Sequence, residues 1–164
     1  MLHQFRTKSD LMTFVVESVY EDELKVYDET LKGIDDPRER LLTYPRVTWE
    51  VLGRPSGLAV LEIMQGSRSD PELAEKLRPI QARIEAEAFN HLEPGLGAGT
   101  IAELLRLIVW TVRGLSIENV LATEPGQVAK TLDVLRSLIE AGIKTGYLHP
   151  EARKRADPTV AAIS

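Results

Sequence analysis

Apolar side chains return every three or four positions along most of this chain, which is the spacing of one face of an α-helix. Alternation with a period of two, which marks a half-buried β-strand, does not extend over any comparable length of the sequence. Between positions 8 and 31, for example, the helical spacing is kept by Leu11, Val15, Val19, Leu24 and Leu31. The sequence therefore predicts an all-α fold.

Proline and glycine residues divide this pattern into about six helical segments. Asp36-Pro37 and Asp70-Pro71 indicate helix starts, because aspartate caps the first N–H groups and proline fits the first turn. Pro45 lies inside a segment and predicts a kink or a break, and Pro79 predicts a bend in another. The expected helices cover residues 8–31, 37–52, 58–65, 71–92, 100–122 and 125–145.

The ends of the first and last helices carry local signals of their own. Thr7 with Asp10 three residues later forms the pattern of a capping box, with Asp in place of the commoner Glu or Gln. Gly33 and Gly146 are expected to end helices in the left-handed conformation. The two residues after Gly146 are predicted to fold back onto the last helix.

The charge of the chain limits what it can bind by itself. It has 25 Asp and Glu residues against 20 Lys and Arg residues, a net charge of −5. Because DNA binding depends on Lys and Arg that neutralise phosphates, we expect the chain alone to bind DNA poorly. The absence of cysteine excludes disulfides and thiolate metal sites. No apolar run reaches the ~18 residues of a membrane helix and no signal peptide follows Met1, so we expect a cytoplasmic protein with no membrane partner.

The first eleven residues read Met-Leu-His-Gln-Phe-Arg-Thr-Lys-Ser-Asp-Leu. This run resembles the junction after the DNA-recognition helix in TetR-family transcriptional regulators, which is roughly aromatic-x-x-Phe, then x-Ser/Thr-Lys, then an acidic residue and Leu. Leu2 departs from the family pattern, because it stands where the family usually has Tyr. The residues that fit the pattern are Phe5, Thr7, Lys8, Asp10 and Leu11.

The order of the expected helices is also similar to that of the TetR family. The resemblance implies a TetR C-terminal-like bundle of about six helices, in which the last two long helices form a four-helix bundle with a second copy. It divides the chain into a remnant of the DNA-recognition helix and junction (1–7), a ligand-binding and dimerisation domain (8–148) and a flexible tail (149–164). The implied function is that of a transcriptional repressor.

His3, Gln4 and Lys8 are the residues that this resemblance places near DNA. His3 and Gln4 would end a helix in the major groove, and Lys8 would hold a phosphate beside the free N–H groups of a helix start. The supporting helices of a helix-turn-helix would take roughly 40 more residues ahead of Met1. The DNA-binding head is therefore expected to be incomplete in this chain, and operator DNA is expected to bind only through the missing part. An ordinary exposed helix start is the alternative.

The resemblance further implies a cavity for a small, mostly apolar effector, enclosed by the first four helices and the start of the fifth. Arg113 is the candidate partner for an acidic group on that effector, with a surface or interface ion pair as the alternative. Plain core packing is the alternative for each apolar or aromatic candidate. These candidates are Met12, Tyr20, Trp49, Met64, Phe89 and Trp110.

The two last helices are expected to form a homodimer. Leu107, Val109 and Trp110 lie outside the main apolar face of the segment 100–122, so one neighbouring helix cannot cover them all. A central helix buried within a monomer is the alternative. Gly114 and Gly142 would allow two backbones to approach closely. The residues predicted at or near the interface are Leu104, Ile108, Leu115, Leu132, Leu135 and Ile139.

No set of catalytic residues stands out, so we expect neither an enzyme nor a cofactor. Glu87 and His91 share a helix face, but a di-iron bundle needs two Glu-x-x-His elements and this spacing is one residue longer. No nucleophilic serine motif and no phosphate-binding glycine loop are present. A stand-alone helical small-molecule-binding or adaptor protein without DNA binding remains the main alternative to the regulator, and a helical-bundle enzyme is the third possibility.

Overall fold

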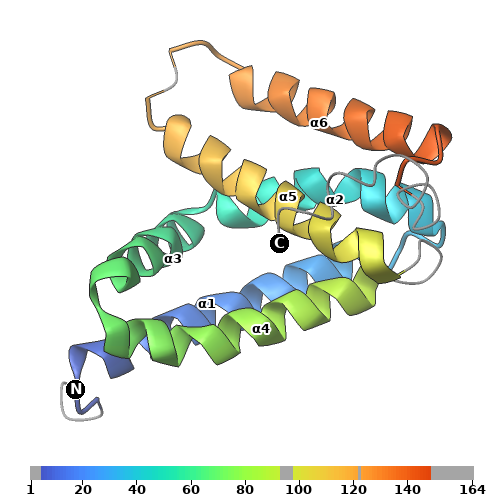
Figure 1. The fold of residues 1–164 in the computed structure, drawn as a ribbon. Coiled ribbons are helices and arrows are strands. Elements are labelled where there is room, and N and C mark those ends of the chain that lie inside the picture. Colours follow the sequence, from blue (N-terminus) through green and yellow to red (C-terminus); the bar gives the residue numbers. More distant parts are fainter. Residues whose placement is uncertain (1–4, 93–97, 122, 149–164) are drawn as a thin grey trace, which may run out of the picture.

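The computed structural model describes residues 5–92, 98–121 and 123–148, and all its regular elements are helical. The predicted all-α fold with six α-helices is confirmed for these residues (Figure 1). His3, Gln4 and the expected tail at 149–164 lie outside the described residues. The elements are α1 (Lys8–Leu31), α2 (Pro37–Leu52), α3 (Pro55–Gly66), the 3-10 helix η1 (Ser67–Ser69), α4 (Pro71–Leu92), α5 (Ala98–Glu118) and α6 (Gln127–Lys144).

The helix starts form where the sequence signals lie. Thr7 and Asp10 make the reciprocal capping box of α1, in which each residue's backbone N–H donates to the other's side chain at 3.0 Å. The carboxylates of Asp36 and Asp70 accept N–H groups in the first turns of α2 and α4, also at 3.0 Å. These bonds satisfy donors that have no partner inside a helix.

Other helix boundaries differ from the sequence expectation. The third helix begins at Pro55 and not at position 58, because proline is well suited to the first helical turn. The fifth helix ends at Glu118, before the expected position 122. Both α2 and α4 continue through Pro45 and Pro79, so the break considered at Pro45 is wrong. Each proline removes one backbone hydrogen bond from its helix without ending it.

Only one of the two expected left-handed caps forms. Gly146 has a φ of 72°, and Leu148 folds back so that its N–H donates to the carbonyl of Gly142 at 3.2 Å. Gly33 does not adopt a positive φ, because Lys32 is still helical and Ile34 instead donates to the carbonyl of Leu31 at 3.1 Å. The cap prediction is therefore confirmed at the last helix and wrong at the first.

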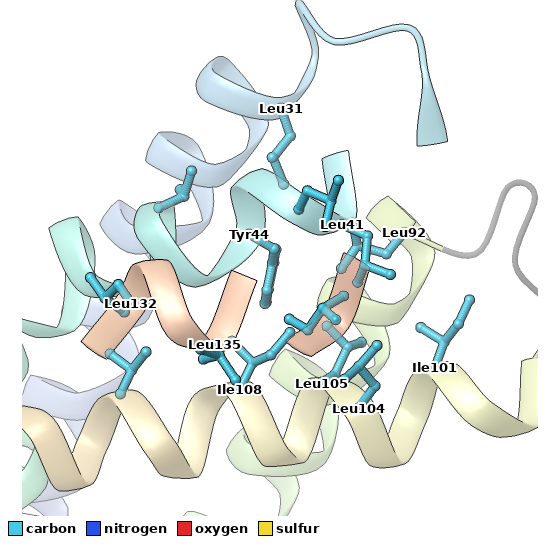
Figure 2. Close-up of a cluster of buried hydrophobic side chains, with 14 of the residues drawn as sticks. Leu31, Leu41, Tyr44, Leu92, Ile101, Leu104, Leu105, Ile108, Leu132 and Leu135 are labelled. Atoms are coloured by element: carbon cyan, nitrogen blue, oxygen red, sulfur yellow. The ribbon is translucent and has the colours of Figure 1, made fainter. Parts of the chain in front are cut away.

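The helices pack as two groups. Figure 1 shows α1 and α4 side by side, while α2 packs against both α5 and α6. The larger core lies around α2, and in Figure 2 buried side chains from α2, α5 and α6 converge there, joined by Leu31 of α1 and Leu92 of α4. A smaller core joins α1, α3 and the first half of α4 and consists of Val16, Tyr20, Val60, Leu73, Leu77 and Ile80.

No helix in the described part of the chain combines the length and the apolar character needed to span a bilayer.

Replacing Leu41 with alanine should destabilise the fold strongly. Leu41 is 1 % exposed in the larger core, so Leu41→Ala removes packed atoms and leaves a cavity, at a cost of about 2–5 kcal/mol. Leu121→Ala is the matched control, because Leu121 is 75 % exposed and its loss should change stability by no more than about 0.5 kcal/mol. Urea unfolding measures both free energies. Equal effects from the two substitutions would contradict the described core.

Candidate functional site

A cavity of about 250 Å³ lies between the two groups of helices. Its described wall comes from α1, α2, α4 and α5 and is mostly apolar. Arg106 and Trp110 are exposed wall residues on α5, so the cavity opens between α5 and α4. At this opening Arg106 pairs with Glu85 at 3.3 Å. The volume is just below the roughly 300–1,000 Å³ of typical small-molecule sites, which suits a small ligand.

Two tyrosines from α1 and α2 form the part of the wall next to the larger core. The rings of Tyr27 and Tyr44 stack with centroids 5.3 Å apart. Burial raises the pKa of both hydroxyls above their ordinary values, and the hydrogen bonds that connect them with each other and with Thr48 offset this only in part. Both side chains therefore stay neutral and present aromatic surface to the cavity.

Tyr20 connects three helices at the α3 side of the cavity. The guanidinium of Arg113 on α5 donates to the Tyr20 hydroxyl at 3.1 Å. That hydroxyl in turn donates to the sulfur of Met64 on α3 at 3.5 Å. Tyr20 is only 3 % exposed. Burial raises the pKa of its hydroxyl, and the positive charge of Arg113 opposes that rise. Arg113 is thus engaged inside the chain by a neutral acceptor.

Glu23, three residues after Tyr20, is the most unusual residue of the wall. Its side chain is buried, with 6 % of the residue exposed, and its Oε1 atom has no hydrogen-bond partner among the described residues. Burial raises the pKa of this carboxyl to about 7, and the positive charges of Arg113 and Arg54 offset only part of that rise. A buried carboxylate without a full set of partners is costly to the fold, which makes it a candidate for function.

Gln81 of α4 supplies a second unpartnered acceptor on the same wall. Its amide nitrogen donates to Glu85 at 3.0 Å, while its buried Oε1 atom has no partner among the described residues. Buried polar atoms are almost always hydrogen-bonded in folded proteins. Two residues of the cavity wall, one on α1 and one on α4, thus carry a buried acceptor that no described residue satisfies.

The structure brings together four of the seven residues that sequence reasoning placed in a ligand pocket. Tyr20, Phe89, Trp110 and Arg113 line the cavity. Met12 and Met64 pack against the smaller core and Trp49 against the larger one, and none of the three belongs to the cavity wall.

Sequence reasoning missed the polar residues of the wall. Glu23 and Tyr27 share a helix face with Tyr20, at spacings of three and seven residues. A carboxylate on an otherwise apolar helix face was a usable signal for a buried acidic group. Gln81 on α4 gave no comparable signal, because its part in the site depends on how α4 lies against α1.

The residues predicted for the dimer interface have a different place in the structure. Leu104, Ile108, Leu132, Leu135 and Ile139 belong to the larger core of a single chain, and Leu115 packs against that core. Their side chains are therefore covered before a second copy arrives. This burial has a simple cause, because the most apolar face of an amphipathic helix packs first against its own chain.

Other apolar side chains of α5 and α6 remain uncovered. We call them the exposed rows, and they are between 47 % and 65 % exposed. Gly114 of α5 lies among them in open space, whereas Gly142 of α6 is covered by Leu148, 2.9 Å from where a Cβ would stand. The exposed rows comprise Leu107 (54 %), Trp110 (63 %) and Ile117 (47 %) of α5 with Val134 (59 %) and Leu138 (65 %) of α6.

The remaining candidates stand apart from the cavity. Lys8 is exposed at the first position of α1. Among the described residues, no group of three or more His, Asp or Glu side chains is arranged to hold a metal ion. Comparison of the chain with protein-family models, with curated proteins and with solved structures found no match.

The buried carboxyl of Glu23 should make stability depend on pH. Below pH 4.5 it is protonated in the folded and unfolded states alike. Between pH 4.5 and about 7 the unfolded chain loses this proton first, so stability falls as the pH rises and levels off above about 7. Glu23→Gln should abolish this loss of stability. Its free energy of unfolding at neutral pH should therefore exceed that of the wild type by up to about 3 kcal/mol.

Chemical unfolding at a series of pH values measures this effect. Glu29→Gln is the matched control on the same helix, because Glu29 is exposed. A Glu23→Gln protein that keeps the wild-type pH profile would show that this carboxyl is not held in a buried environment.

Proposed function

We propose that this chain is the ligand-binding and dimerisation region of a TetR-like transcriptional regulator, most simply a repressor. The observation that carries the proposal is the mostly apolar cavity with a few buried polar groups between α1, α2, α4 and α5. Such cavities are the usual form of small-molecule sites. The resemblance of the first residues to the TetR junction supplies the regulatory part of the proposal.

The course of α1 supports a connection between the cavity and the N-terminal end. The helix runs unbroken from Lys8 past Tyr20 to Leu31, so Glu23 lies about 22 Å along the axis from its first residue. At that first turn Lys76 of α4 pairs with Asp10 at 2.6 Å. A ligand that changes how α1 lies against α4 would therefore move the junction, provided that ligand and DNA favour different states.

The exposed rows support self-association. Aromatic and aliphatic side chains such as Trp110 and Leu138 are more than half exposed on the last two helices. Gly114, open to solvent between Trp110 and Ile117, leaves room for a close backbone approach. A symmetric homodimer through these rows would bury them on both copies at once.

DNA binding is proposed to need a helix-turn-helix ahead of Met1. The net charge of −5 disfavours contact with phosphates, and Lys8 alone cannot neutralise enough of them. In a dimer, each copy would carry one helix-turn-helix, and the pair would bind two adjacent half-sites of an operator, as dimeric helix-turn-helix proteins do.

Fusing a TetR-type head of known operator ahead of Met1 tests this function. The fusion should bind a labelled operator duplex much more tightly than the isolated head, because dimerisation joins two half-site contacts, while the present chain should not bind. Fluorescence anisotropy measures the affinities. A fusion no tighter than the head alone would contradict the regulator.

A charged side chain introduced into the exposed rows should prevent two copies of the chain from forming a dimer. Leu107→Glu is expected to give a monomer, because it would place a carboxylate in an apolar interface, whereas Leu11→Glu changes an exposed leucine of α1 and should leave the dimer intact. Sedimentation equilibrium gives the mass of each variant. A wild-type chain that is monomeric at all concentrations would remove the proposed dimer.

A stand-alone helical binding protein is the second candidate. The net negative charge favours this candidate, since an acidic chain binds the phosphates of DNA poorly. In that case the cavity would bind its ligand, and the head fusion would gain nothing from the chain.

A further inference from the structure

The wall of the cavity holds hydrogen-bond acceptors that lack donors. Oε1 of Glu23 and Oε1 of Gln81 are both buried and both without a partner among the described residues. They come from α1 and α4, and both residues line the same cavity. A ligand that matches this wall must bring N–H or O–H donors.

We propose that the ligand is a small amine with an apolar body, and that Glu23 binds its ammonium group. This inference rests on the proposed small-molecule-binding function and names its ligand class. An ammonium group has three donors and no acceptor, so it offers one donor to the free oxygen of Glu23 and has others left for further acceptors of the wall. Its positive charge also compensates a carboxylate that is removed from water, which a neutral donor cannot do.

The aromatic residues of the wall favour the same ligand class. Tyr27, Tyr44, Phe89 and Trp110 all line the cavity. Aromatic faces attract cations and also bury apolar groups. The wall therefore offers contacts to both the charged and the apolar part of such a molecule.

An acidic ligand fits the wall less well, although Arg113 is near. The Arg113 guanidinium already donates to Tyr20 at 3.1 Å, and at the opening Arg106 pairs with Glu85. An added carboxylate would bring further acceptors to a wall with two unpartnered ones and would face the charge of Glu23. We therefore propose that Arg113 holds Tyr20 in place, and not that it binds an acidic effector.

Three probes with the same aromatic body test the proposal: 1-naphthylmethylamine, 1-naphthylmethanol and 1-naphthoate. At about pH 8, above the pKa of about 7 for Glu23, the amine should bind at least about tenfold more tightly than the alcohol, and the acid should bind weakest. Calorimetry gives the affinities, and amide NMR shifts of residues around Tyr20 and Phe89 show that the cavity is the site.

Substitutions identify the group responsible. Glu23→Gln keeps the shape of the side chain and should reduce amine binding about tenfold or more while leaving the alcohol nearly unchanged. Glu29→Gln, on the exposed side of the same helix, should leave both affinities unchanged. Circular dichroism confirms that each variant is folded.

The outcomes separate the two proposals. Equal binding of amine and alcohol, or a Glu23→Gln protein that still prefers the amine, would overturn the ligand class and leave a small-molecule site in place. Failure of all three probes to shift the cavity residues, even at millimolar concentration, would count against the binding function itself.

Discussion

The packing of α5 and α6 against α2 is the interaction on which the rest of the structure depends. Leu41, Tyr44 and Val51 of α2 are almost fully buried in the larger core, to which both later helices contribute. Because α2 occupies this central place, α5 turns one side to the larger core and another to α3 and α4. The cavity lies on that second side, so its shape depends on the same packing that stabilises the fold.

For the proposed ligand, the cavity would be a compromise between stability and binding. A wall made only of leucine and phenylalanine would be easier to bury than one that holds Glu23 and Gln81. The chain retains these groups beside neutral tyrosines and ties Arg113 to Tyr20, which keeps the polar atoms in fixed positions. A ligand with matching donors binds to such a wall without first having to order it.

Local signals in the sequence predicted most of the helical framework. Thr7 with Asp10, Asp36 and Asp70 act within one turn of the backbone, and α1 has the bounds that its spacing indicated. The cavity was harder to predict from the sequence, because the neighbouring helices decide which side of a helix faces a cavity. Trp49 thus joins the core although its size suggested a pocket. The same reason explains why periodicity led to Leu104 and Ile108 and not to Leu107, since periodicity finds the best-covered face of a helix.

Trp110 belongs both to the wall of the cavity and to the exposed rows of α5. A second copy that covers this indole also covers the edge of the opening between α4 and α5. In the proposed dimer, self-association and ligand binding would share this residue, and thermodynamic linkage would make each change the other by the same factor. Under these two proposals, the apparent ligand affinity would depend on the concentration of the protein, so a cell could tune the response to the ligand by changing how much of the protein it makes.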